Sequence, residues 1–425
     1  MNPVKIINKE LVIIGGGPAS LAAALEAEKL GIEEILILER NNELGGILEQ
    51  CIHDGFGLHR FKKQLSGPQY AQMFIDEVEN SNIEIKLNTM VLDVNSNKII
   101  YAVNSDEGML EIHSKAIIFA MGCRERTRNQ VFIFGTRPSG IMTAGTAQRY
   151  MNIEGLIPGE RVVILGSGDI GMIMARRMTL EGMKVEGVYE VMNRPGGLAR
   201  NISQCLNEYN IPLHLSTTVT EVRGKHKLEG VVVQKVDKNM NPISGTERYI
   251  ECDLLILSVG LIPENELSIK AGVTLSPITK GPYIDNNMMT NIEGIFAAGN
   301  VLNVFDLVDY VSDTGEIAAK GAYKYINNKF NSSKSVEILA GDNVNFLIPN
   351  TYRIEENGEV NFYFRTKTEI EEATVSVWQG NKKLYSKRHS ILRPQEMVLA
   401  HLNNEELKEI NYSDPILVKV NKAGE

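Results

Sequence analysis

Short continuous runs of hydrophobic residues, rather than alternating ones, mark the first part of this chain. Residues 12–14 (Val-Ile-Ile) lead directly into a glycine turn at residues 15–17, and residues 162–165 (Val-Val-Ile-Leu) lead into a second turn at residues 166–168. A short apolar run that ends in glycine is typical of a buried strand in a parallel sheet. We therefore expect a strand followed by a tight turn in both places.

The same pattern continues after each turn. A predicted helix over residues 21–30 and strand over 35–38 end at Glu39; a predicted helix over 172–180 and strand over 184–189 end at Glu190. Each acid follows the first glycine of its turn at the same spacing. Glycines in such a turn let the backbone approach a pyrophosphate, and an acid at this distance accepts hydrogen bonds from an adenosine ribose. The sequence therefore predicts two dinucleotide sites.

One glycine-rich turn alone could be purely structural, because any tight strand-to-helix turn favours glycine. The repetition of strand, turn, helix, strand and terminal acid favours the binding interpretation over the structural one. Ser20 stands where the motif has its third glycine. Serine is nearly as small, so we expect binding to persist.

Alternating strands and helices fill the chain up to about residue 326, which predicts an α/β fold with two Rossmann-type domains. Residues 327–334 are rich in Asn, Ser and Lys and resemble a linker. Beyond them, alternating apolar positions and a turn at Gly380-Asn381 are typical of hairpins. We expect residues 340–425 to form a small antiparallel β domain, which either steadies the subunit's own fold or docks another protein.

Composition narrows the function. The chain has 425 residues, 43% of them hydrophobic, and a net charge of −9, which argues against nucleic acid or an anionic membrane as a partner. No apolar stretch approaches the roughly 18 residues that span a bilayer, and we expect a cytoplasmic protein. The four cysteines form no Cys-x-x-Cys pair. We therefore expect free thiols, no metal site and no redox dithiol.

The order of these landmarks resembles the FAD- and NAD(P)-dependent pyridine nucleotide oxidoreductases that are related to disulfide reductases. The resemblance covers residues 10 to about 330. It implies that the first turn and its acid bind FAD, that the second turn and its acid bind NAD, and that a late Gly-Asp motif, here Gly299-Asn300, contacts the FAD ribitol. The expected FAD residues are Gly15, Gly17, Pro18, Ala19, Ser20, Glu39, Arg40, Gly45, Gly46, Gly122, Gly299 and Asn300. The expected NAD residues are Gly166, Gly168, Asp169, Ile170, Gly171, Glu190 and Gly260.

The resemblance also implies a domain order. An FAD-binding domain over residues 1–125 and 256–330 is interrupted by an NAD-binding domain over residues 126–255, and the β domain follows. Residues 45–57 and 137–148 are similar to the subgroup encoded with bacterial FAD-dependent glycerol-3-phosphate dehydrogenases. They are more distantly similar to FAD/NAD subunits of opine, sarcosine and proline dehydrogenases.

The expected function is therefore exchange of electrons between NAD(H) and a partner through FAD, in a glycerol-3-phosphate dehydrogenase-like system. The partner would be a second flavoprotein subunit or a small redox protein. A stand-alone NADH oxidase or ferredoxin-type reductase, an amine- or opine-type dehydrogenase subunit, and a low-turnover docking subunit remain alternatives.

Two residues are candidates for a catalytic role. Cys51 falls in the segment that carries the two cysteines of disulfide reductases, so it could contact the flavin as a thiolate, or it could be a buried apolar residue. His53 could lie near the flavin, or it could be satisfied by local hydrogen bonds.

Overall fold

The computed structural model describes residues 4–330, 334–354, 358–408 and 410–422. The chain folds into two compact units. The first unit comprises Met1–Leu48, Asp54–Cys123 and Pro263–Glu425, and the second comprises Glu49–His53 and Arg124–Ile262. Each unit contains one of the two glycine turns.

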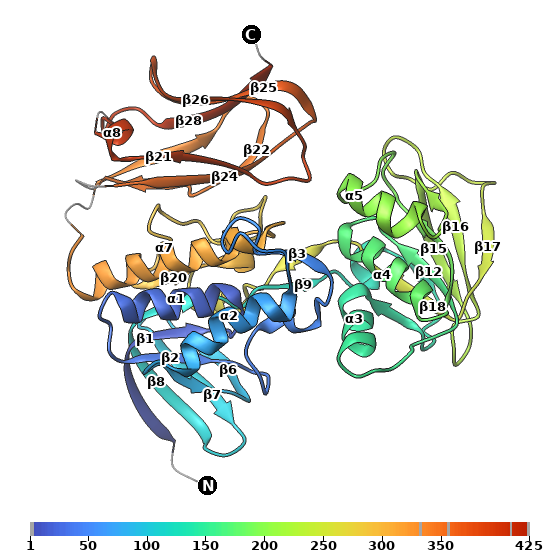
Figure 1. The fold of residues 1–425 in the computed structure, drawn as a ribbon, viewed down its shortest axis with the longest axis horizontal. Helices are drawn as coiled ribbons and strands as arrows, with labels where there is room; N and C mark the ends of the chain where they lie inside the picture. Colours follow the sequence, from blue (N-terminus) through green and yellow to red (C-terminus); the bar gives the residue numbers. More distant parts are fainter. Residues whose placement is uncertain (1–3, 331–333, 355–357, 409, 423–425) are drawn as a thin grey trace. The chain divides into compact units, whose positions relative to one another are not determined.

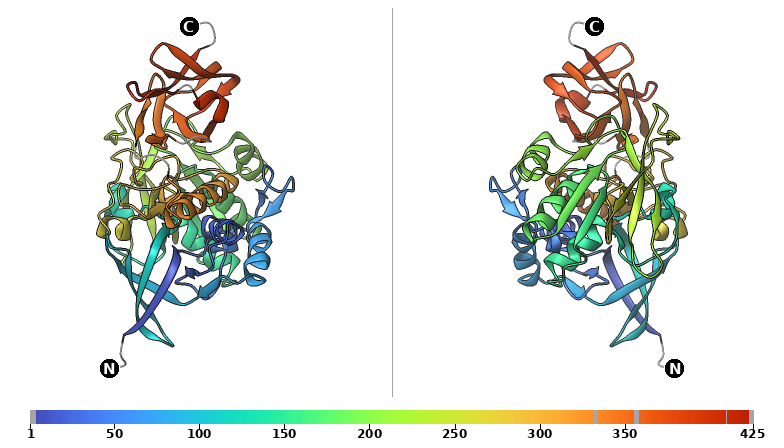
Figure 2. Two further views of the ribbon diagram at one scale, coloured as in Figure 1. Left: turned by 90° about the vertical axis from the view of Figure 1, so that its left-hand side faces the viewer. Right: turned by 90° about the vertical axis from the view of Figure 1, so that its right-hand side faces the viewer.

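A parallel sheet forms the centre of the first unit (Figure 1). Its parallel strands lie in the order β5 (Glu84–Lys86), β2 (Ile35–Leu38), β1 (Lys5–Ile14), β8 (Gly108–Phe119) and β20 (Ile295–Ala297). The long strands β1 and β8 lie side by side and extend to the end of the sheet near the N-terminus (Figure 2). There β7 (Ile99–Asn104) pairs with β8, and β6 (Thr89–Val94) pairs with β7, both in antiparallel fashion. All the carboxyl ends of the parallel strands therefore meet at one edge, beside the first glycine turn.

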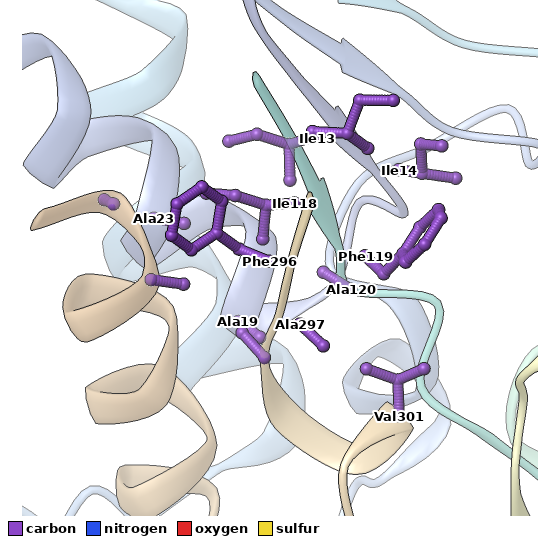
Figure 3. Close-up of a cluster of buried hydrophobic side chains, with 14 of the residues drawn as sticks. Ile13, Ile14, Ala19, Ala23, Ile118, Phe119, Ala120, Phe296, Ala297 and Val301 are labelled. Carbon is purple, nitrogen blue, oxygen red and sulfur yellow. The ribbon is translucent and has the colours of Figure 1, made fainter. Parts of the chain in front are cut away.

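Three helices accompany this sheet: α1 (Pro18–Lys29), α2 (Gly67–Glu79) and α7 (Val308–Ile326). The core between the sheet and the helices contains Ile13, Ile118 and Phe296, all fully buried (Figure 3). Helix α7 packs closely on α1. A Cβ added at Gly315 would lie only 2.2 Å from the Ala19 carbonyl oxygen. This close packing fixes the N-terminus of α1 beside the end of β20.

The second unit contains another parallel sheet, in the order β11 (Ile141–Thr143), β18 (Leu254–Leu257), β12 (Arg161–Leu165), β13 (Lys184–Tyr189) and β14 (Leu213–His214). Alternate side chains of the central strands serve two cores. Val162 and Ile164 pack with α3 (Ala144–Asn152) and α4 (Asp169–Leu180). Val163 and Leu165 pack with a four-stranded sheet that includes β15 (Thr217–Arg223) and β16 (Gly230–Lys235). Burial on both faces explains why these strands read as continuous apolar runs.

The C-terminal segment forms two stacked sheets. The larger has the order β23 (Thr351–Arg353), β21 (Ser335–Ala340), β28 (Ile416–Lys422), β25 (Ile370–Gln379) and β26 (Lys382–Leu392), and the smaller comprises β22 (Val344–Ile348), β24 (Val360–Thr366) and β27 (Val398–Leu402). The predicted hairpin at Gly380-Asn381 is present between β25 and β26. Most strand pairs of this segment are antiparallel, as predicted, but β21 pairs with β28 in parallel, which the prediction of an antiparallel domain did not include. That pairing joins the two ends of the segment, and local sequence does not encode it.

The C-terminal sheets also begin earlier than expected, at Ser335, and they belong to the first compact unit. Residues 331–333 of the expected linker lie outside the described residues. Strand β24 buries both of its faces: Phe362 and Phe364 lie in the core between the two sheets, whereas Tyr363 belongs to the core of the first unit. The ring of Tyr363 meets that of Phe305 edge to face at 5.4 Å.

Candidate functional site

The first glycine turn links β1 to α1. Gly15 has φ +111°, and a Cβ there would lie 2.4 Å from the carbonyl oxygen of Ala120, at the end of β8. Only glycine fits such a position without displacing the neighbouring strand. Gly17 is the N-cap of α1, and no side chain caps the helix. A Cβ at Gly17 would meet no atom within 4 Å, so this side of its backbone faces open space.

Glu39 shapes this turn. The residue is 5% exposed; one carboxylate oxygen accepts the Gly16 backbone N–H at 2.6 Å, and the other accepts the Asn41 N–H at 2.8 Å. An ionised carboxylate offers about four acceptor positions, so two remain for ribose hydroxyls. The acid is therefore fixed in place before any ligand arrives.

Two further glycine segments come together at the same helix end. The Gly45 N–H donates to the Gly16 carbonyl at 2.9 Å, and a Cβ at Gly46 would lie 3.1 Å from the Cα of Gly17. From the other side, a Cβ at Gly299 would lie 2.9 Å from that of Ala19. The structure thus gathers segments far apart in sequence around the N-terminus of α1, as a dinucleotide-binding turn requires.

Asn300 uses both ends of its amide. Its Nδ2 donates to Cys123 Sγ at 3.6 Å, and its Oδ1 accepts the Phe305 N–H at 3.0 Å. A carboxylate has no N–H and could not donate to the sulfur in this way. Ser20 is fully buried, and its hydroxyl has no hydrogen-bond partner among the described residues. Arg40 is exposed next to Glu39.

The second glycine turn links β12 to α4 and repeats the first turn's backbone. Gly166 has φ +99°, and a Cβ there would lie 2.0 Å from the Ser258 carbonyl oxygen at the end of β18. A Cβ at Gly171 would lie 2.6 Å from the Gly166 carbonyl oxygen, so this third glycine permits close packing of the helix. Ile170 follows Asp169 in the first turn of α4 and is partly buried.

Glu190 is 7% exposed and more heavily engaged than Glu39. One oxygen accepts both the backbone N–H and the hydroxyl of Ser167, at 2.9 and 2.7 Å, and the other accepts the Met192 N–H at 2.9 Å. The same Ser167 hydroxyl accepts the Gly196 N–H at 2.9 Å. Neither Ser167 nor residues 191–201, which we name the strap, were predicted to belong to the site; the doublet Gly196-Gly197 was the available signal.

Gly122 and Gly260 lie where the chain passes between the units, and both have positive φ. The Gly122 carbonyl accepts the Glu264 N–H, and the Gly260 carbonyl accepts the Arg126 N–H, each at 3.0 Å. These bonds hold the crossing points of the chain, and the roles of the two glycines in nucleotide binding stay predictions.

Cys51 and His53 belong to the short segment Glu49–His53 of the second unit. Gln50 donates to the Gly145 carbonyl and to Gln148 Oε1, and the Cys51 thiol lies 3.9 Å from the same Gln148 oxygen. Burial, with a smaller contribution from Glu49, raises the pKa of the Cys51 thiol to about 12. That pKa favours a neutral thiol over the thiolate that flavin contact would need. His53 is partly buried.

All four cysteines are thiols rather than disulfides, and no group of three or more His, Cys, Asp or Glu in the described part of the chain could hold a metal ion. None of the described helices is long and apolar enough to cross a bilayer.

The sequence profile of the family described as pyridine nucleotide-disulphide oxidoreductase matches residues 9–315. The chain belongs to this family. Its members are oxidoreductases that use FAD and NAD(P)H, which are therefore the cofactors of this chain. The open backbone at Gly17 and the buried acids Glu39 and Glu190 fit two such dinucleotides.

Several known proteins are similar to this chain in sequence. Hydrogen cyanide synthase subunit HcnB of Pseudomonas protegens is 27% identical over 285 residues, which cover 62% of this chain and 58% of that protein. An opine oxidase subunit of Agrobacterium tumefaciens is 24% identical over 314 residues, covering 68% and 61%. The chain thus spans about three fifths of the length of these relatives.

Among solved structures, thioredoxin reductase of T. acidophilum aligns with a TM-score of 0.60 at 24% identity, covering 75% of this chain and 98% of that one. This likeness confirms the predicted α/β fold with Rossmann-type sheets.

Proposed function

We propose that this chain transfers electrons between NAD(H) and a partner protein through FAD. The first glycine turn is assigned to FAD and the second to NAD(H). Both turns follow the carboxyl end of a parallel strand, and both have a buried acid already bonded to the turn's own backbone. Fixed polar groups of this kind bind a ligand without having to reorganise.

For FAD, residues of the first unit fit the pyrophosphate and the ribose of the ADP moiety. The pyrophosphate would approach the backbone at Gly17, where no protein atom stands in the way, and the ribose hydroxyls would donate to Glu39. Asn300, at the Gly299-Asn300 motif, is held by its contacts with Cys123 and Phe305. When bound, FAD supplies the hydride chemistry.

For NAD(H), the second unit offers the turn at Gly166 and Gly168 and the acid Glu190. A negative charge at the ribose favours a free 2′-hydroxyl over a 2′-phosphate. NADH is therefore the proposed nucleotide rather than NADPH. Arg194, four residues after Glu190, is a cation that would weaken this preference if it paired with the 2′-phosphate.

The absence of a dithiol supports the proposal that the flavin exchanges electrons with a partner protein. Cys51 is the one cysteine in its segment, and burial favours its neutral form. Without a second cysteine in that segment, Cys51 cannot form a disulfide there that would accept electrons from the flavin. The electrons must then pass to another molecule.

The nature of that partner is the finer part of the proposal. The resemblance of residues 45–57 and 137–148 favours a glycerol-3-phosphate dehydrogenase-like system. The similarity to the opine oxidase subunit favours a second candidate, an amine- or opine-oxidising complex. HcnB is likewise named as a subunit, which supports a multi-subunit assembly in either case.

Formation of NADH from NAD⁺ by the full-length, FAD-loaded protein tests this proposal. Glycerol 3-phosphate and opines are electron donors, so we expect no NADH formation by the protein alone and fast NADH formation when a subunit captured from native extract is added with one of these substrates. Fast oxygen-dependent NADH consumption by the isolated protein would instead identify a stand-alone NADH oxidase.

A further inference from the structure

The strap lies directly against the second glycine turn. The Gly196 N–H donates to Ser167 Oγ at 2.9 Å, and a Cβ at Gly196 would lie 3.6 Å from the Gly168 backbone nitrogen. A Cβ at Gly197 would lie only 2.9 Å from the Asp169 backbone nitrogen. The backbone of the strap thus lies beside the first backbone nitrogens of α4, the end of the helix to which a pyrophosphate would bind.

Asp169 fastens the far end of the strap. Its Oδ1 accepts the Leu198 N–H at 2.8 Å and the Asn201 side-chain amide at 2.6 Å. Hydrogen bonds to an ionised carboxylate are about twice as strong as neutral ones. Asn201 is 8% exposed, and the following π-helix, Ile202–Asn207, buries Cys205 and Leu206 in the core of the second unit. The strap is therefore anchored at one end and pinned along its length.

The first turn also has a glycine doublet beside it, Gly45-Gly46, but that doublet is held differently. The Gly45 N–H donates to a backbone carbonyl, that of Gly16. Helix α1 begins with Pro18 where α4 begins with Asp169, and proline has neither a carboxylate nor a backbone N–H. Fastening by side chains is thus a property of the second site and not of the shared motif.

We propose that Asp169 and Ser167 latch the strap over the second turn, and that NAD(H) binds after the strap has left it. The proposal rests on the assignment of NAD(H) to this turn. Asp169 is then a positioning residue, which sets how often the site is open rather than contacting the nucleotide. Because only the open form binds, the measured Kd equals the Kd of the open site divided by the fraction of molecules that are open.

Two variants separate the latch from simple charge repulsion between Asp169 and the pyrophosphate. Asp169→Ala removes both hydrogen bonds and the charge. Asp169→Asn removes the charge but keeps an Oδ1 that can accept from Leu198 and Asn201. A third variant, Asn201→Ala, removes one of the two bonds without altering Asp169.

The test is calorimetric titration of the full-length, FAD-loaded protein with NAD⁺. We expect Asp169→Ala to bind NAD⁺ about tenfold more tightly than wild type, Asn201→Ala about threefold more tightly, and Asp169→Asn within about twofold. In wild type, saturating NAD⁺ should also speed hydrogen exchange of the Gly196 and Leu198 amides, which the closed strap protects.

An affinity of Asp169→Ala that is equal to or weaker than that of wild type would overturn the latch. So would an equal gain in Asp169→Asn, which would assign the effect to charge, or unchanged exchange at Gly196 and Leu198 when NAD⁺ is bound. If NAD⁺ binds neither wild type nor Asp169→Ala, the assignment of the second turn to NAD(H) fails as well.

Discussion

The two glycine turns have similar backbones, a buried glutamate and a glycine doublet beside each, yet within the described part of the chain side chains fasten the second doublet and not the first. Gly45 bonds to the backbone of its turn, whereas the strap is held by Ser167 and Asp169. Two turns with the same motif therefore need not be equally accessible to a nucleotide. The first turn suits a cofactor that stays bound, and the latched turn suits a nucleotide that must enter and leave in each cycle.

The largest expected effect comes from a valine in each turn. Gly17→Val should abolish FAD binding, because its side chain enters the space of the pyrophosphate while touching no protein atom at Cβ. The matched variant Gly168→Val should keep FAD but lose reduction by NADH; a Cβ there lies 3.8 Å from the nearest atom, Ser258 Oγ. The flavin absorbance of each purified protein measures the first effect. Full flavin occupancy in Gly17→Val would contradict the assignment.

The C-terminal sheets belong to the same unit as the first turn, and Arg353 joins them to residues 285–286 of that unit. Arg353 donates from Nε to the buried Asp285 at 3.1 Å and from its backbone to Asn286 at 2.6 Å. Removing one partner of a buried pair costs about 3–5 kcal/mol. We expect Arg353→Ala to lower the free energy of unfolding by about 3 kcal/mol, measured by denaturant titration. As a control, Arg393→Ala, which breaks exposed ion pairs, should change it by less than about 1 kcal/mol.

The pH dependence of that variant gives a second check. Burial raises the pKa of Asp285 above its ordinary value, so the folded protein binds this proton more tightly than the unfolded chain does. Stability contributed by the neutral carboxyl is therefore gained as pH falls through the raised pKa. The deficit of Arg353→Ala should shrink toward acidic pH. A deficit that grows on acidification would mean that the pair is not the cause.

Glu39 and Glu190 should differ in their effect on the selectivity of the protein for NADH over NADPH. We expect NADH to reduce the flavin at least about tenfold faster than NADPH, because Glu190 repels a 2′-phosphate. Glu190→Gln should narrow this ratio, whereas Glu39→Gln should weaken FAD retention and leave the ratio unchanged. Stopped-flow reduction of FAD-loaded protein measures both. Equal rates with the two nucleotides in wild type would exclude this role for Glu190.

The smallest effect is expected at Cys51. Cys51→Ser should leave flavin reduction by NADH unchanged, because no dithiol lies on the path. With a pKa of about 12, the native thiol should also resist iodoacetamide from pH 7 to 9. Loss of reduction in a folded variant that still holds FAD, or fast alkylation at pH 8, would require a functional thiolate.

Local signals predicted both turns, their acids and the hairpin at Gly380, because each depends on neighbouring residues. The hydrogen bonds of the strap could not be predicted, because backbone N–H groups of Gly196 and Leu198 donate them and nearly every residue carries such a group. The doublet Gly196-Gly197 was the sequence signal that could have drawn attention to this segment. The sequence predicts the last helix of the α/β body over about residues 314–326, but helix α7 begins at Val308, six residues earlier. Its first turns contain Asp309 and Asp313, acids typical of a solvated surface, which here contact the backbone of His59 and the side chain of Arg60, respectively.

The most direct test of the central claim is an anaerobic titration of the FAD-loaded protein with NADH, followed by flavin absorbance and free NADH. Two dinucleotide sites without a disulfide predict that one equivalent of NADH reduces one FAD completely and that further NADH stays unoxidised until a partner is added. Consumption of a second equivalent by the isolated protein would reveal another electron acceptor in this chain and would contradict the account.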